Sequence, residues 1–468
     1  MNFFFYDLET SGLDAAYDQI LQFAAVRTDE DFNEIEEPIE IFCRVRPDVL
    51  PTPTAISINC INVRELEEKG VCEFELAQQI DRILRGAGEQ CVIGYNSLEF
   101  DDEFIRFLLY RNLLDPYEWH WQNGNNRLDL FQLCGLGFGF DALGSISLDD
   151  GKGGLSLKLE NLARANGLVH EKAHDALSDV RVTVQLARLI KRNNPKLFEH
   201  ALKLRNKTEV ARIVRDAEMF CHSKSFYTYE KNFLALHAYL CALKTRSNSL
   251  ISWKLNCDPT DVLGMSADEV REQMYARGDE RRLAVGFHDL ATNQVPMVTR
   301  YNVTKCEQRI QDHEGCLRNL DLVKKHRSQL ELLGNEVLGT SIPEKELDAD
   351  LYHADYFRDV DEDRTVLQQF RLDPHSLEPS RFSRLRFKRQ LFRVIARNYP
   401  ERLTDGKKES YNSWLNNERL GENAPKGCCC WSNFDTELDG CLAGTRISDE
   451  QRGALTELRA FLHERHVR

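Results

Sequence analysis

The chain has 468 residues, which is enough for about three domains at roughly 150 residues each. Its 42% hydrophobic and 29% charged residues, with 26 Gly and 13 Pro, exclude a disordered or collagen-like chain and are typical of a globular protein. The 75 acidic and 61 basic residues give a net charge of −14, which excludes a uniformly basic surface. Any nucleic-acid site must therefore be a local groove.

The N-terminal residues predict a cytoplasmic protein. One short apolar run leads directly to Asp7 and lacks the basic flank of a secretory signal, and no stretch approaches the ~20 apolar residues needed to span a bilayer. We therefore expect no membrane contact, and we expect the 14 cysteines to be reduced. Cys428, Cys429 and Cys430 lack the two-residue spacer that lets cysteine pairs reach one zinc ion, so we interpret them as free thiols.

Residues 1–195 alternate between strand and helix patterns. Three apolar runs predict strands at 3–8, 20–27 and 40–46, and the short turns between them predict an antiparallel meander. A helix is predicted at 76–84, a short strand at 91–95 and a helix at 101–111. A helix at 158–166 ends at Gly167, and another begins near Asp175, which is expected to cap it. This alternation is typical of an α/β sheet.

The rest of the chain has a mixed pattern that becomes helical and charged toward the end. Two basic stretches, 203–215 and 379–400, run against the acidic average, and the second contains no acidic residue. Either stretch could bind a polyanion or an acidic partner. The apolar residues interleaved in 379–400 also predict an amphipathic core helix with a solvated basic face, and both interpretations stay open.

Three places carry the residues suited to catalysis. Asp7 and Glu9 stand at the end of the first strand, and because strand side chains alternate, both carboxylates project to the same face. Such a pair is costly to bury unless a cation neutralises it, which suggests a divalent metal. By itself the pattern is also compatible with a solvated strand end.

The second and third places lie at predicted helix starts. Asp101 stands at a strand–helix junction, with Asp102 as a competitor, and by itself it could simply interact with the helix dipole. Asp179 lies about one turn into the helix that begins near Asp175, and His174 precedes that helix on a loop. A lone histidine of this kind is usually structural.

Together, these residues resemble the DEDDh class of 3′→5′ exonucleases, which have a ribonuclease-H-like fold. The motifs of that class read Asp-x-Glu-Thr, Asn followed by Phe-Asp, and His-x4-Asp, and all three are present here. A narrower resemblance, to the bacterial exodeoxyribonuclease I family, extends over nearly the whole chain and includes residues 22–29, 115–122, 164–167 and 396–400. Residues 11–13 read Ser-Gly-Leu where that family more often has Phe-Gly.

The resemblance implies three domains. They are an α/β ribonuclease-H-like exonuclease domain at 1–195 with a mixed sheet and flanking helices, an SH3-like β-containing domain at 196–345, and a C-terminal helical domain at 346–468. In the family these form a clamp on single-stranded DNA. The acidic C-terminal tail of single-strand-binding protein is a further partner that the resemblance implies, and such a clamp can act as a monomer.

The chemistry of the motif residues predicts a metal-dependent hydrolase. Four carboxylates can hold two Mg²⁺ ions, for which Mn²⁺ can substitute, because hard cations prefer oxygen ligands. Histidine titrates near neutral pH and suits a general base. We therefore assign His174 as the base, and as metal ligands Asp7, Glu9, Asp101 and Asp179. The Phe-Asp pattern of the resembling class favours Asp101 over Asp102.

Single-stranded DNA is usually bound by aromatic platforms together with cations. Tyr117 and Trp121 are expected to stack on bases, whereas Trp119 is as well explained as a core residue. By resemblance, Lys158 takes the place of a substrate-contacting arginine. The predicted substrate contacts are Glu9, Thr10, Arg106, Tyr117, Trp121 and Lys158.

The leading hypothesis is a metal-dependent 3′→5′ exodeoxyribonuclease that processively degrades single-stranded DNA to 5′-mononucleotides, in DNA repair or recombination. An exoribonuclease of the same fold is the first alternative, because the residues do not show how a 2′-hydroxyl is treated. A non-catalytic DNA-binding scaffold is the second, although such a relic would be expected to have lost at least one of the acids.

Overall fold

The computed structural model describes residues 2–86, 88–170, 173–224, 232–277, 280–301, 307–353, 363–373, 378–444 and 447–467. The chain forms two compact units. The first consists of Met1–Asn126, Val169–Val184 and Ile342–Arg468, and the second of Arg127–Leu168 and Gln185–Ser341. Within the described residues, no helix has the length and apolar character that crossing a membrane requires.

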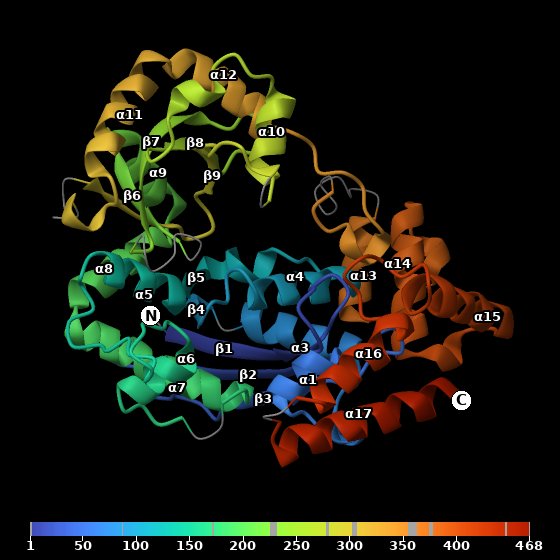
Figure 1. Cartoon of the computed structure of the whole chain (residues 1–468). Coiled ribbons are helices and arrows are strands. Elements are labelled where there is room, and N and C mark those ends of the chain that lie inside the picture. Colours follow the sequence, from blue (N-terminus) through green and yellow to red (C-terminus); the bar gives the residue numbers. More distant parts are fainter. Residues whose placement is uncertain are drawn as a thin grey trace. The chain divides into compact units, whose positions relative to one another are not determined.

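The first sheet has the strand order β3-β2-β1-β4-β5 (Figure 1). β1 (Asn2–Thr10) pairs antiparallel with β2 (Ile20–Thr28), and β2 with β3 (Ile39–Phe42), which confirms the predicted meander. β4 (Gln90–Gly94) runs parallel to β1, and β5 spans Asn126–Asp129. β3 is shorter than predicted because its pairing with β2 ends near Cys43, where the chain forms an isolated bridge with Val71.

Two helices cover one face of this sheet. α3 (Glu73–Gly86) and α4 (Asp101–Arg111) bury their apolar sides against β1 and β2 in one hydrophobic cluster. α4 has the predicted bounds, whereas α3 is longer than the predicted 76–84. Two short helices, α1 (Pro53–Asn59) and α2 (Val63–Lys69), occupy a stretch for which no element was predicted.

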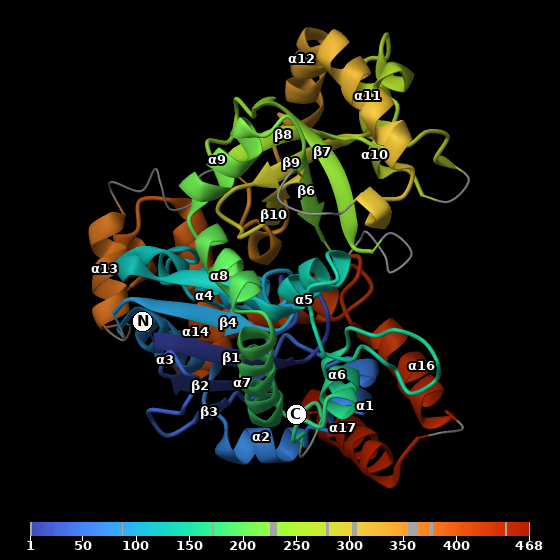
Figure 2. The same ribbon diagram turned by 90° about the vertical axis from the view of Figure 1, so that its left-hand side faces the viewer.

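The C-terminal segment belongs to the same unit and is helical, as predicted. Its helices are α13 (Arg364–Leu372), α14 (Leu385–Asn398), α15 (Asp405–Trp414), α16 (Trp431–Leu442) and α17 (Asp449–Val467). α14 packs on Phe107 and Tyr110 of α4. α16 and α17 pack on α1, and both views show these three helices side by side (Figures 1 and 2).

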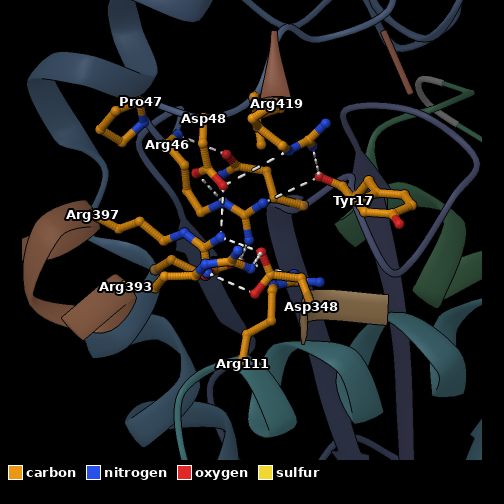
Figure 3. Close-up of polar contacts among 12 residues, drawn as sticks. Tyr17, Arg46, Pro47, Asp48, Arg111, Asp348, Arg393, Arg397 and Arg419 are labelled. Carbon is orange, nitrogen blue, oxygen red and sulfur yellow. Dashed lines mark hydrogen bonds and ion pairs between the residues drawn. The ribbon is translucent and has the colours of Figure 1, made fainter. Parts of the chain in front are cut away.

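A buried ion-pair network also joins the two ends of the chain (Figure 3). Arg397 of α14 lies 2.8 Å from Asp48 and 2.5 Å from Asp348. Arg386 and Arg393 of the same helix pair with Asp350 and Asp348. Three arginines of the basic stretch 379–400 are therefore compensated inside the protein, which supports its interpretation as an amphipathic core helix.

The second unit contains an antiparallel five-stranded sheet of order β10-β6-β7-β8-β9. Its strands are β6 (Phe220–Ser223), β7 (Leu234–Ala242), β8 (Ser249–Lys254), β9 (Phe287–Ala291) and β10 (Met297–Arg300). α11 (His313–Lys325) and α12 (Arg327–Leu338) lie against this sheet (Figure 2). The remaining helices are α5 (Leu130–Gly139), α6 (Leu159–Ala165), α8 (Pro195–Leu204), α9 (Lys207–Asp216) and α10 (Ala267–Tyr275). α7 (Ala176–Asn193) begins in the first unit and ends in the second.

Candidate active site

β1 carries the first two acids of the site. Tyr6 belongs to the core cluster formed with α3 and α4, so the alternation along the strand places Asp7 and Glu9 on the opposite face. β1 is hydrogen-bonded to β2 on one side and to β4 on the other. The pairing with β4 covers Asn2–Phe5, and the pairing with β2 continues through Asp7 and Glu9, so β2 is the strand that holds the backbone of the two acids.

The first two residues of α4 have different surroundings. The Tyr6 hydroxyl donates to Oδ1 of Asp102 at 2.5 Å, and the Arg106 guanidinium lies 3.6 Å from Oδ2. Asp101 is also buried, but it is close enough to Asp7 for its charge to raise the pKa of that carboxyl. Because both oxygens of Asp102 are engaged, this arrangement supports Asp101 as the metal-ligand candidate.

α7 supplies the third part of the site. Oδ1 of Asp175 accepts a hydrogen bond from the backbone N–H of Ser178 at 3.0 Å, which confirms the predicted helix cap. Asp179 lies one turn into the helix, and the exposed His174 precedes it with φ 62°. In the part of the chain that the structure describes, Glu9, His174 and Asp179 form the only group of three metal-binding side chains whose ligand atoms all lie within 4.8 Å.

Two further residues contact this group and were not singled out by sequence reasoning. Nε2 of His170 lies 2.5 Å from Oδ1 of Asp179, so two histidines approach the same carboxylate. Asn59, at the end of α1, hydrogen-bonds the Glu9 carboxylate. His170 stands four residues before His174, but this spacing alone does not distinguish a contact from a solvated loop residue.

The acids of the site resist ionisation when no cation is present. Burial raises the pKa of Asp7 well above its ordinary value, and the charges of Asp101, Asp179 and Glu9 raise it further. Burial, with the charges of Asp179 and Asp101, raises the pKa of Glu9 to about 8. Burial also raises the pKa of Asp179, although the neighbouring imidazoles oppose the shift.

The donor set fits divalent ions. Asp7 and Asp101 lie outside the 4.8 Å group, but the charges of Asp101, Asp179 and Glu9 all raise the pKa of Asp7, so the four carboxylates influence one another electrostatically. Hard cations such as Mg²⁺ and Mn²⁺ prefer oxygen ligands of this kind, whereas zinc favours His and Cys. A bound cation would also remove the mutual repulsion that raises these pKa values.

Besides Glu9, two residues predicted to contact DNA are buried. Thr10 is 7% exposed, and its hydroxyl donates to the carbonyl of Gly12 at 2.8 Å. Arg106 is 4% exposed and pairs with Asp102 and Glu103, so its charge is compensated inside the protein. DNA contact by these two side chains stays a prediction.

The aromatic residues predicted to meet DNA differ in exposure. Trp121 is 58% exposed, and Tyr117 is partly buried against the cluster around α14. Trp119 is fully buried, with its indole N–H donating to the carbonyl of Pro116 at 3.0 Å, so it is a core residue. Leu13, on the loop after Thr10, is 84% exposed.

Two other predictions concern Lys158 and the three adjacent cysteines. Lys158 is an exposed residue at the N-terminus of α6, in the second unit. Cys428, Cys429 and Cys430 are buried free thiols, as interpreted from their spacing. Burial raises the pKa of Cys428 to about 12, so this thiol is a poor nucleophile and a poor metal ligand at neutral pH.

Comparison with known protein families gives three consecutive matches. A family model described as exonuclease matches residues 4–187, the exonuclease I SH3-like domain matches 205–337, and the exonuclease I C-terminal domain matches 345–465. The chain is similar to exodeoxyribonuclease I of Escherichia coli, at 30% identity over 89% of each chain. It is also similar to exodeoxyribonuclease I of Haemophilus influenzae, at 38% identity over 59% of each chain.

Solved structures show the same similarity over the whole length. The structure of E. coli exonuclease I in complex with a dA16 oligonucleotide matches with a TM-score of 0.85 and 28% identity, covering 99% of each chain. A zinc-bound complex of the E. coli enzyme with single-stranded DNA matches with a TM-score of 0.87, as does a complex of SSB and exonuclease I with the inhibitor CFAM.

Proposed function

The chain belongs to the exonuclease I family and is an exodeoxyribonuclease, and on that premise we propose that its clustered carboxylates hold the divalent ions with which it hydrolyses single-stranded DNA from the 3′ end. The observation that carries the proposal is the convergence of acids from three elements: Glu9 and Asp179 lie with His174 in one group within 4.8 Å, and Asp101 is close enough for its charge to raise the pKa of Asp7. The four ligands are Asp7, Glu9, Asp101 and Asp179. Two Mg²⁺ ions are the proposed cofactor because all four donors are carboxylate oxygens.

Each part of the site has a task in cleaving the P–O3′ bond. Divalent ions bound there neutralise charge on the scissile phosphate and on the leaving 3′ oxygen. His174 is exposed on its loop and lies beside Glu9 and Asp179, where it accepts the proton of the attacking water. The water oxygen bonds to phosphorus as the P–O3′ bond breaks, which leaves a 5′-mononucleotide and a strand with a new 3′-hydroxyl.

The proposed partners are single-stranded DNA and single-strand-binding protein. The exposed indole ring of Trp121 offers a stacking surface for a base, and the exposed apolar side chain of Leu13 offers a second surface against which a base can pack. The E. coli relative has been solved with single-stranded oligonucleotides, and exonuclease I has been solved with SSB. Processive degradation by a monomer, in DNA repair or recombination, completes the proposal.

One experiment tests direction, strand preference and metal dependence together. The purified protein is incubated with 5′-labelled single-stranded DNA, the matching duplex, and RNA of the same sequence, with Mg²⁺ or with EDTA. We expect stepwise shortening of the single-stranded DNA from its 3′ end, only with Mg²⁺. Comparable shortening of RNA would favour the exoribonuclease alternative, and shortening in EDTA would contradict the metal site.

The Asp7→Ala variant tests the assigned residues. We expect it to abolish nucleotide release in Mg²⁺ while single-stranded DNA binding, measured by fluorescence anisotropy, persists. Glu37→Ala is the matched control, since Glu37 is an exposed acid of the same unit. Undiminished release by Asp7→Ala would refute the assignment, and a wild type that binds DNA but releases nothing would support the scaffold hypothesis.

A further inference from the structure

A buried hydrogen bond joins β1 to α4 directly beside two of the proposed metal ligands. The hydroxyl of Tyr6 donates to Oδ1 of Asp102 at 2.5 Å. Both side chains are almost completely buried, at 1% exposure each. Inside a protein such a bond is stronger than in water, because its partners have no competing solvent.

The members of this bond are chain neighbours of the ligands. Tyr6 precedes Asp7, and Asp102 follows Asp101. The bond therefore ties together the two backbone segments that carry Asp7 and Asp101. Its geometry fixes how far the end of β1 can move from the first turn of α4.

The two ligands need such a restraint because they repel each other. After burial, the charge of Asp101 is the largest influence that raises the pKa of Asp7. Like charges in a poorly solvated site push their supports apart unless other contacts hold them. The Tyr6–Asp102 bond opposes that separation from the core side of the sheet.

Both members of the bond are themselves held in place. The Tyr6 ring stacks on Phe23 of β2, with centroids 6.3 Å apart. Arg106, one turn along α4, lies 3.6 Å from Oδ2 of Asp102 and also pairs with Glu103. The hydroxyl of Tyr352 donates to Glu103, so the chain of contacts continues to the C-terminal segment.

We propose that the Tyr6–Asp102 hydrogen bond is a brace that presets the separation of Asp7 and Asp101 for divalent ions. The inference rests on the proposed metal site and makes Tyr6 and Asp102 positioning residues that do not touch substrate. It also gives Arg106 a role that its burial permits, namely holding Asp102 at the correct rotamer.

Tyr6→Phe is the direct test, because it removes one oxygen and keeps the ring against Phe23. Mn²⁺ binding to the whole protein is measured by electron paramagnetic resonance, and the Mg²⁺ concentration for half-maximal nuclease activity is measured alongside. We expect the Mn²⁺ dissociation constant to rise about tenfold, the lower end for contacts that orient metal ligands. The affinity for single-stranded DNA in EDTA is expected to stay unchanged.

Tyr110→Phe is the matched control. Tyr110 is a fully buried tyrosine of α4, and its hydroxyl donates to the carbonyl of Leu347 at 2.7 Å, away from the acids. Each variant loses one buried hydroxyl, and Tyr110→Phe also loses the hydrogen bond that this hydroxyl accepts from Arg386 at 3.0 Å, so we expect its Tm to fall at least as much as that of Tyr6→Phe. Only Tyr6→Phe should weaken Mn²⁺ binding. If both variants raised the Mn²⁺ dissociation constant equally, the Tyr6–Asp102 bond would contribute only to general stability, and the proposal would be overturned.

Asp102→Asn and Asp102→Ala separate the hydrogen bond from the charge. The amide oxygen of Asn can still accept the Tyr6 hydroxyl, so Mn²⁺ affinity should be largely kept in Asp102→Asn and weakened in Asp102→Ala. Equal, complete loss in both would make Asp102 a ligand and overturn the brace. A wild type that binds no Mn²⁺ would overturn both the brace and the metal site, whereas normal Mn²⁺ binding by Tyr6→Phe would overturn the brace alone.

Discussion

Two clusters of acidic side chains in the first unit show opposite electrostatics. At the active site, burial and like charges raise the pKa of Glu9 to about 8 and raise the pKa of Asp7. In the ion-pair network of Figure 3, burial also acts to raise the pKa of Asp48, but Arg397 and Arg46 hold it well below its ordinary value. Arg393 and Arg397 overcome burial in the same way and lower the pKa of Asp348.

The difference lies in the source of positive charge. In the network, arginines from both ends of the chain surround Asp48 and Asp348, and this compensation joins segments that are far apart in sequence. At the active site, neighbouring acids outnumber the two histidines that oppose them. The protein neutralises its own carboxylates where they hold the fold together, and it leaves them for a divalent ion where they act on substrate.

The largest expected effect comes from breaking the compensated cluster. Asp348→Asn removes the charge that pairs with Arg393 and Arg397 and leaves both guanidinium groups buried without it. We expect the free energy of unfolding to fall by about 3–5 kcal/mol, as for other buried pairs that lose one partner. Urea unfolding followed by circular dichroism measures this fall in the free energy of unfolding. A loss below about 1 kcal/mol would mean that the network is not important for stability.

The next effect is the stabilisation of the uncompensated cluster by metal. With Mg²⁺ at 100 times its dissociation constant, the free energy of unfolding of the wild type should rise by about 2.7 kcal/mol. Asp7→Asn should lose this gain and should be at least as stable as wild type in EDTA, because it removes a mutually repelling charge. The same Asp→Asn change would then alter the free energy of unfolding in opposite directions at the two clusters. An Asp7→Asn variant that is as destabilised in EDTA as Asp348→Asn would contradict the comparison.

The pH dependence of stability sharpens the comparison further. Because the pKa of Glu9 is raised from 4.5 to about 8, its contribution to stability is present below pH 4.5 and is lost as the pH rises toward 8. The pKa values of Asp48 and Asp348 are lowered from 3.8, so their contribution is present above that pH and is lost on acidification.

Glu9→Gln measures this pH effect. Unfolding of Glu9→Gln and wild type in EDTA is compared at pH values from about 5 to 8. Wild type should lose stability relative to the variant as the pH rises, by at most about 1.4 kcal/mol per pH unit. A constant difference between the two proteins would show that this carboxyl titrates normally.

The sequence indicated a candidate active site but gave no sign of the ion-pair network, for a physical reason. Asp7, Asp101 and Asp179 stand at ends of elements with clear apolar periodicity, and chain-local motifs mark them. The partners of Asp48 are set by tertiary packing, so no spacing rule identifies them. His170 was not predicted as a site residue for the same reason, because only the folded loop brings it into contact with Asp179.

Other differences from the predicted elements have local causes. α1 and α2 have seven residues each, too short for a periodic pattern to identify them. Their starts nevertheless carry capping signals, Thr52 before Pro53 and Asn62 before Val63, whose side chains accept backbone hydrogen bonds. The Phe-Asp motif already favoured Asp101 over Asp102 as a ligand, and the contacts of Tyr6 and Arg106 with Asp102 support the same choice.

The smallest expected effect on stability comes from α14, a helix that carries both arginines paired with acids and exposed arginines. Arg397 is buried between two acids, whereas Arg389 is exposed. Arg389→Ala should change the free energy of unfolding by less than about 0.5 kcal/mol, because exposed side chains contribute little to stability. Arg397→Ala should cost several times more, because it leaves Asp48 and Asp348 without a shared partner.

If the exposed arginine meets a DNA phosphate, Arg389→Ala should also lower the salt dependence of single-stranded DNA binding by about one counterion. Unchanged salt dependence would assign the exposed side of α14 to solvent, and a loss of stability equal to that of Arg397→Ala would remove the distinction between the two kinds of arginine.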